Sequence, residues 1–170
     1  MNPYVSLAKL AVENKESLNR KSGVFVTIEK EGQLRGCIGT YLPTKENIAE
    51  EIIFNAIAAA TEDYRFGPIQ EKELSSLSYT VYLLNKPELV LKKEVSDPPK
   101  FFFEKLRRAR LDPKKYGIIV KTVLKSGLLL PGLDGIDTIE QQISIACQKG
   151  GIDPNCERII IYKFTVEKYD

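Results

Sequence analysis

Residues 23–40 read Gly-Val-Phe-Val-Thr-Ile-Glu-Lys-Glu-Gly-Gln-Leu-Arg-Gly-Cys-Ile-Gly-Thr, and this stretch decides the fold. The apolar residues Val24, Val26 and Ile28 lie two positions apart, which is the period of a β-strand. The Glu-Gly pair at 31–32 is typical of a tight turn, and residues 34–40 then return as a second strand. The segment therefore predicts a β-hairpin.

The rest of the chain alternates less regularly between helical and strand patterns. Residues 45–61 carry a wide apolar face with a run of alanines, and Thr44 is the expected N-cap. Further helices are expected at 3–18, at 101–110 and from the capping box at Thr138 to Gly150, and further strands at 78–84, 117–123, 127–130 and 160–166. Between 87 and 99 no period is evident. Hairpins with separated helices predict an α+β fold with a mainly antiparallel sheet flanked by helices.

Length and composition predict one domain over residues 1–170, with a larger lobe and a smaller subdomain. Hydrophobic residues make up 43% and charged residues 28%, and the net charge of +2 is too small to favour a nucleic-acid or membrane-surface protein. No apolar run reaches the roughly 18–20 residues that span a bilayer. The N-terminus lacks the basic and apolar regions of a secretory signal. We therefore expect a cytoplasmic protein without a membrane partner.

The chain has no histidine and only three cysteines, Cys37, Cys147 and Cys156. The missing histidine excludes Cys–His and Ser–His catalytic pairs and the usual histidine-ligated metal sites. An odd number of cysteines without C-x-x-C spacing argues against structural zinc and against a disulfide framework. We expect no metal and no other cofactor. Cys147 lies on the apolar stripe of its helix and is expected in a core.

Several segments together resemble the AMMECR family (AMME chromosomal region gene 1). They are Gly23–Thr27, Leu34–Thr40, the Asn55-Ala pair with its alanine-rich continuation, Asp63–Phe66, Lys115–Val120 and Leu128–Pro131. Their order and spacing cover essentially the whole chain, and the hexapeptide Arg35–Thr40 is rather specific to that family.

The resemblance implies a larger lobe, built on an antiparallel sheet with helices, and a smaller lobe that leaves a cleft. It also implies Memo-like and radical-SAM proteins as partners, because the family's domain is found beside or fused to them in bacteria and archaea. It implies no defined reaction. Tyr64 departs from the family pattern, which usually has Pro or a small residue there, and the stretch from Phe101 to Arg110 is longer and more basic than the family leads us to expect.

The Arg-Gly-Cys-Ile-Gly segment carries the candidate chemistry. In a strand, Arg35, Cys37 and Gly39 share one face, while Leu34, Gly36 and Ile38 share the other. An arginine near a thiol favours the thiolate, which is the nucleophilic form. Gly36 and Gly39 would leave the backbone open to close approach by a ligand.

A second cluster comprises Asn55, Glu62, Asp63 and Arg65, at or near the end of the alanine-rich helix. We expect that helix to pack across the hairpin and to bring the Asp-Tyr-Arg-Phe turn near Cys37. Asp63 or Glu62 would then be the general base, and Arg65 an anion clamp, with Asn55 also placed in the substrate site.

Simpler structural interpretations remain open for each of these residues. Cys37 could be a small packed side chain, Arg35 could pair with Asp63 or Glu62, Asp63 could only end its helix, and the glycines could mark a bulge. The basic run at 105–115 is more typical of a solvated face than of nucleic-acid binding. Two functions follow. One is an enzyme acting on a small anionic molecule at Cys37, and the other is a non-catalytic module that binds partner proteins.

Overall fold

The computed structural model describes residues 19–170, except the side chains of 99–101 and 103. The expected helix at 3–18 lies outside the described residues. The chain divides into two compact units, and each has its own sheet. Unit 1 comprises the chain up to Asn85 together with residues Glu167–Asp170, and unit 2 comprises Lys86–Val166.

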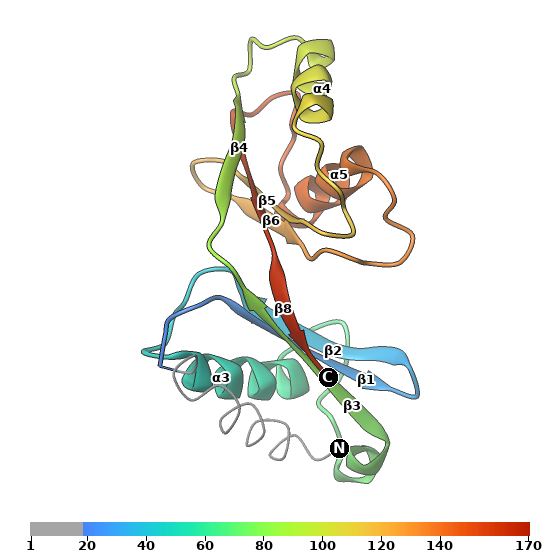
Figure 1. The fold of residues 1–170 in the computed structure, drawn as a ribbon. Coiled ribbons are helices and arrows are strands. Elements are labelled where there is room, and N and C mark those ends of the chain that lie inside the picture. The colour runs from blue at the N-terminus through green and yellow to red at the C-terminus, as the bar shows by residue number, and fades with distance from the viewer. Residues whose placement is uncertain (1–18) are drawn as a thin grey trace. The chain divides into compact units, whose positions relative to one another are not determined.

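Unit 1 is an antiparallel sheet with one long helix on one face (Figure 1). Its strands, in the spatial order β2-β1-β3-β8, are β1 (Val24–Lys30), β2 (Gln33–Thr40), β3 (Leu77–Leu84) and β8 (Val166–Tyr169). The helix is α3 (Ile48–Thr61), and a 3-10 helix, η1 (Glu71–Ser76), precedes β3. β2 is therefore an edge strand.

The predicted hairpin is present as β1 and β2. Glu31 and Gly32 both have positive φ, at 53° and 76°. This conformation suits the right-handed twist of two-residue hairpins. The register slips by one residue between Ile28 and Glu29, so Arg35 is the extra residue of a bulge in β2.

The helix α3 begins later than expected. Its N-cap is Asn47, whose side chain accepts a hydrogen bond from the Glu50 amide, so the expectation of Thr44 as the cap is wrong. Both the amide and the hydroxyl of Thr44 instead donate to the buried Glu51 carboxylate, at 2.6 and 2.9 Å. The carboxylate of Glu51, a residue of α3, therefore accepts the hydrogen bonds of the loop that precedes the helix.

A glycine lets α3 lie directly on the hairpin. Gly36 is buried, and a Cβ there would overlap the carbonyl oxygen of Ala59. The core beneath consists of alternate strand residues and the inner stripe of the helix: Val24, Val26, Ile28, Ile48, Ile52, Ala59, Leu77 and Leu83. The other face of the sheet carries the intervening residues.

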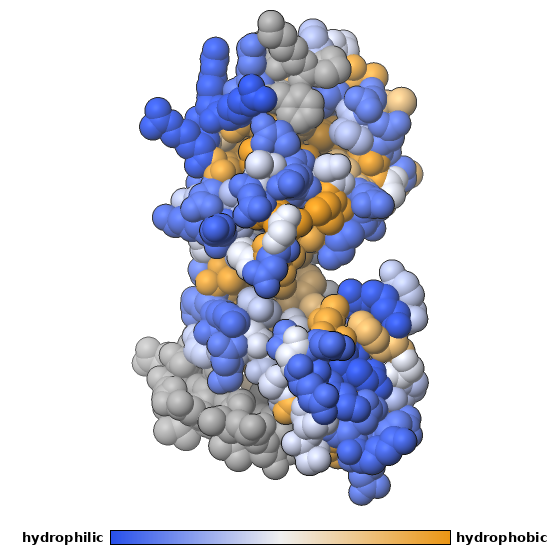
Figure 2. Space-filling model, turned by 90° about the vertical axis from the view of Figure 1, so that its right-hand side faces the viewer, coloured by the Kyte–Doolittle hydropathy of each residue, from blue (hydrophilic) through white to orange (hydrophobic). Residues whose placement is uncertain are grey.

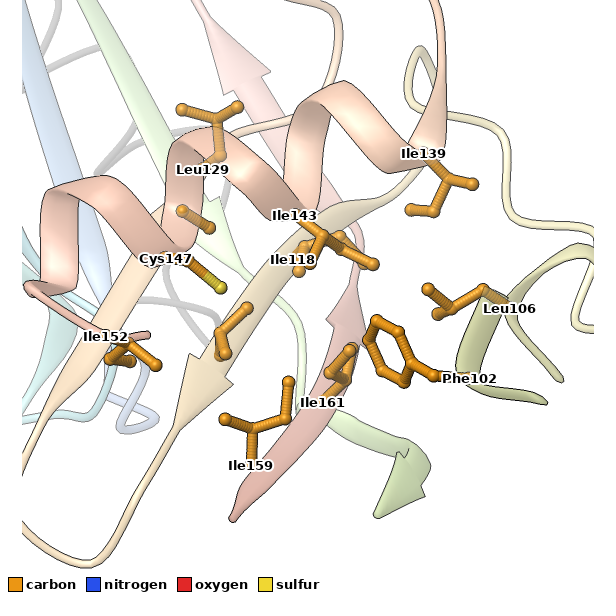
Figure 3. Close-up of a cluster of buried hydrophobic side chains, with 12 residues drawn as sticks. Phe102, Leu106, Ile118, Leu129, Ile139, Ile143, Cys147, Ile152, Ile159 and Ile161 are labelled. Carbon is orange, nitrogen blue, oxygen red and sulfur yellow. The ribbon is translucent and has the colours of Figure 1, made fainter. Parts of the chain in front are cut away.

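Unit 2 is a second antiparallel sheet with two helices. Its strands, in the order β4-β7-β5-β6, are β4 (Glu88–Lys93), β5 (Gly117–Lys121), β6 (Ser126–Leu129) and β7 (Ile159–Phe164), and its helices are α4 (Pro99–Arg108) and α5 (Ile139–Gly150). The predicted capping box of Thr138 with Gln141 is present, and Gly151 ends α5 in the left-handed conformation. In Figure 3 Cys147 and Ile143 of α5 point toward the strand residues Ile118 and Ile161.

The expected α+β class with antiparallel pairing and flanking helices is confirmed, but the strands form two sheets. The single strand expected at 160–166 is divided near Thr165 between β7 and β8, which belong to different sheets. Strand β4 was not expected, because its charged residues conceal the strand period.

The surface is mixed in character. Figure 2 shows hydrophobic residues in several patches among hydrophilic ones. Within residues 19–170, no helix combines the length and apolar character required to cross a membrane.

The contact between Gly36 and Ala59 predicts a large cost for Gly36→Ala. The added methyl group must displace the helix backbone, so we expect the free energy of unfolding to fall by about 3 kcal/mol or more. Urea denaturation measures this loss. Gly67→Ala is the matched control, because a Cβ at Gly67 meets nothing within 4 Å. Equal, small effects of the two substitutions would contradict the close contact.

Candidate functional site

Cys37 lies near the middle of β2, on the sheet face that points away from α3. It stands opposite Thr27 of β1, and the Thr27 hydroxyl donates to the Cys37 Sγ at 3.3 Å. The side chain is partly exposed. The thiol is therefore accessible from the outer face and already has one hydrogen-bond donor.

The peptide groups of Cys37 are held at the open edge of the sheet by two side chains. The Cys37 N–H donates to the Asp63 Oδ2 at 2.8 Å, and Arg65 Nη2 donates to the Cys37 carbonyl at 3.2 Å. Arg65 also binds both oxygens of Asp63, at 2.9 and 2.6 Å. We call this arrangement of Asp63 and Arg65 around Cys37 the strand clamp.

A turn presents the strand clamp to β2. The Phe66 amide donates to the Asp63 carbonyl at 2.9 Å, which closes a turn immediately after α3. The expected proximity of this turn to Cys37 is therefore observed. Glu62 is the C-cap residue of α3, with its amide donating to the Ala58 carbonyl. Its side chain is exposed and no contact ties it to Cys37 within the described part of the chain.

The strand clamp gives Asp63 a low pKa. The hydrogen bond from Arg65 lowers the pKa to about 2; burial opposes this shift, and the Cys37 and Arg65 amides add to it. A carboxylate with such a pKa holds a proton poorly at neutral pH. Asp63 is thus suited to holding the strand rather than to accepting a proton.

Arg35 pairs with neither Asp63 nor Glu62. Its Nε and Nη2 bind both oxygens of Glu73, at 3.1 and 3.0 Å, and its remaining nitrogen donates to the Gly67 carbonyl. The hydrogen bond from Arg35 is the main reason that the pKa of Glu73 is lowered to about 2. Sequence reasoning missed Glu73. The available signal was Gln70 followed three residues later by Glu73, a capping arrangement in which the Gln70 amide donates to the Glu73 carboxylate.

The two glycines of the segment are covered by packing. Gly36 faces Ala59 of α3, whereas on the outer face a Cβ at Gly39 would overlap the Phe25 ring. The backbone at these positions therefore approaches parts of the protein itself.

Asn55 and Glu51 lie in the interior of unit 1. Asn55 is completely buried, and its Nδ2 donates to the Glu51 carbonyl at 2.9 Å, while its Oδ1 has no partner among the described residues. Glu51, which sequence reasoning missed, accepts from Thr40, Thr44 and Lys45. Asn55 is thus separated from the surface on which the Cys37 thiol lies.

The other two cysteines differ from Cys37 in their surroundings. Burial raises the pKa of the Cys147 thiol to about 11, and the neighbouring Asp153 raises that of the exposed Cys156. Within the part of the chain that the structure describes, no three His, Cys, Asp or Glu residues are grouped to hold a metal ion.

Acid titration tests the strand clamp. Because the folded-state pKa of Asp63 is depressed, its contribution of about 2 kcal/mol is complete above its ordinary pKa of 3.8 and is lost as the pH falls through about 2. Asp63→Asn should lower the free energy of unfolding by about that amount at pH 7. The difference from the wild type should shrink between pH 4 and pH 2, which denaturation at each pH measures. A constant difference across that range would contradict the assignment.

Comparison with known proteins identifies the family of this chain. The family model described as AMMECR1 matches residues 4–169. A protein of Thermotoga maritima is 44% identical over 99% of this chain and 97% of its own length. A protein of Clostridium acetobutylicum is 43% identical over 99% of this chain, but this chain spans only 36% of its length.

A solved structure agrees with the sequence comparisons. The crystal structure of an uncharacterized protein from Pyrococcus horikoshii has a TM-score of 0.76 and 30% identity, covering 97% of this chain and 87% of the other. The family model, the fold and the Thermotoga relative, which matches over nearly its whole length, agree with one another: this chain belongs to the AMMECR1 family.

Proposed function

We propose that the chain is an enzyme that acts on a small anionic molecule, with the Cys37 thiol as its nucleophile. One observation carries the proposal. The strand clamp holds the Cys37 peptide groups on one side, while the thiol stays partly exposed with the Thr27 hydroxyl as a donor. A nucleophile held in one geometry loses little entropy when it reacts.

Arg65 is the cation best placed for an anionic group of the substrate. Its Nε and Nη2 are used in the strand clamp, and its Nη1 donates to no other residue within 19–170. The pKa of Arg65 is raised, mainly by its hydrogen bond with Asp63. Arg35 is bound by Glu73, so in this proposal it positions β2.

The proposed step needs no histidine. The sulfur attacks an electrophilic carbon of the substrate as its proton passes to solvent, a carbon–sulfur bond forms, and the leaving group departs with the bonding electrons. With its pKa near 2, Asp63 remains an anion throughout and orients Arg65 and β2. Glu62, which is exposed, has no step assigned to it.

The second candidate is a non-catalytic module that binds partner proteins. It is favoured by the engagement of Arg35 and Asp63 in ion pairs within unit 1. The Clostridium relative is also much longer than this chain, which fits a domain that works beside others. In this proposal the partners are Memo-like and radical-SAM proteins.

Alkylation separates the two candidates. At pH 7.5, iodoacetamide should label Cys37 before Cys147, which is buried, and before Cys156, whose pKa is raised by its hydrogen bond with Asp153. Time-resolved peptide mass spectrometry measures the three rates in one sample. Labelling of Cys37 no faster than that of Cys147 would reject the nucleophile and favour the binding module.

Replacement of Arg65 tests its assignment as the neighbouring cation. Arg65→Gln should slow alkylation of Cys37 by about three- to tenfold, since a nearby positive charge favours the thiolate. Arg158→Gln is the matched control, because Arg158 pairs with Glu94 in unit 2. Denaturation curves of both variants show whether any slowing arises from unfolding. An unchanged rate in a folded Arg65→Gln variant would remove Arg65 from the site.

A further inference from the structure

The outer face of the unit 1 sheet carries a row of polar side chains that begins at Cys37. Cys37 stands opposite Thr27, which stands opposite Thr80 of β3. The Thr80 hydroxyl donates to the Asp170 Oδ1 at 2.9 Å. The row therefore consists of a thiol and two hydroxyls on three neighbouring strands, followed by the carboxylate of Asp170, the residue after β8.

Both hydroxyl protons in this row are already used. Thr27 donates to the Cys37 sulfur and Thr80 donates to Asp170. Each hydroxyl has one proton and two acceptor lone pairs. In this arrangement the two neighbouring oxygens present acceptor lone pairs, which suits a ligand group that donates to both of them.

A second, aromatic row lies beside the first. Gly39 of β2 stands opposite Phe25, which stands opposite Tyr82 of β3, and both rings are partly exposed. Burial is the main cause of the raised pKa of Tyr82. Lys168 of β8 pairs with Asp170 at 3.1 Å, so the carboxylate that accepts from Thr80 also has a cationic partner.

We propose that this face binds a planar heteroaromatic ring that carries an exocyclic amino group. The ring lies against Phe25 and Tyr82, and the two N–H groups of the amine donate to Thr27 and Thr80, one to each. Side chains directly opposite on paired strands are roughly 5 Å apart at Cβ. That separation suits one nitrogen with two hydrogen bonds of about 2.9 Å.

The inference rests on the proposed function, because it names the ligand class of the same site. A ring held on the aromatic row lies beside Cys37, where an electrophilic carbon attached to the ring meets the sulfur. Any anionic group of the ligand is left to Arg65 at the strand edge.

The test uses adenine and purine, which share a ring system and differ in the exocyclic amino group. Each is titrated at millimolar concentration into the isotope-labelled full chain, and the amide signals of Phe25, Thr27, Thr80 and Tyr82 are followed by NMR. We expect both to shift these signals and adenine to bind about fivefold more tightly, as two added hydrogen bonds of modest net worth imply. Absence of shifts with both probes, or equal affinity for both, would overturn the inference.

Variants of Thr80 assign the effect to the polar row. Thr80→Val keeps the β-branched shape and removes the oxygen, so the preference for adenine over purine should fall toward twofold or less. Thr80→Ser keeps the oxygen and should retain the preference. Thr61→Val is the matched control, since the Thr61 hydroxyl donates to the Ile57 carbonyl at the exposed end of α3. A preference that survives in folded Thr80→Val would refute the role of the row.

The outcome is separate from that of the alkylation experiment. Fast alkylation of Cys37 without adenine-induced shifts would leave the nucleophile in place and reject this ligand class. Shifts at Thr27 and Thr80 with an inert Cys37 would support the ring site and reject the proposed enzyme.

Discussion

The close approach of α3 to the edge strand β2 is the constraint on which unit 1 depends. It exists because Gly36 has no side chain, so the backbone of Ala59 can lie against the strand. Asp63 follows Ala59 by four residues, about one helical turn, and therefore emerges from α3 beside Cys37. The position of the strand clamp is thus a geometric consequence of a missing Cβ one residue before the cysteine.

Unit 2 has a similar contact, in which a glycine of an edge strand lets a helix backbone approach closely. Gly127 of the edge strand β6 would place a Cβ against the carbonyl oxygen of Ala146 in α5. In both units a helix backbone thus packs directly against one face of an edge strand. In unit 1, a buried carboxylate together with an arginine also binds the peptide groups of the strand. Close packing of a helix on an edge strand therefore does not by itself account for the strand clamp.

Local patterns in the sequence predicted most helices and strands, but they could not predict contacts between residues far apart in the chain. The hairpin, α3 and the capping box of α5 follow from period, turn residues and caps within a few positions. The proximity of Asp63 to Cys37 was predictable because α3 joins them directly. The pairing of Arg35 with Glu73 was not, since 38 residues separate them and several carboxylates could have served equally well. Likewise, nothing in the pattern of residues 160–166 assigns β7 and β8 to different sheets.

The two arginines near Cys37 differ in how many of their N–H donors already bind the protein. This difference decides which of them can bind a ligand. Arg35 gives its Nε and Nη2 to Glu73 and its Nη1 to a carbonyl, and its side chain is 16% exposed. Within residues 19–170, Arg65 donates through Nε and Nη2 alone, and its side chain is 42% exposed. A cation that is fully coordinated by its own chain has to break hydrogen bonds before it binds an anion, and that cost opposes binding. Of the two arginines that the sequence placed near the thiol, Arg65 therefore retains binding capacity, and Arg35 holds in place the strand that carries Cys37.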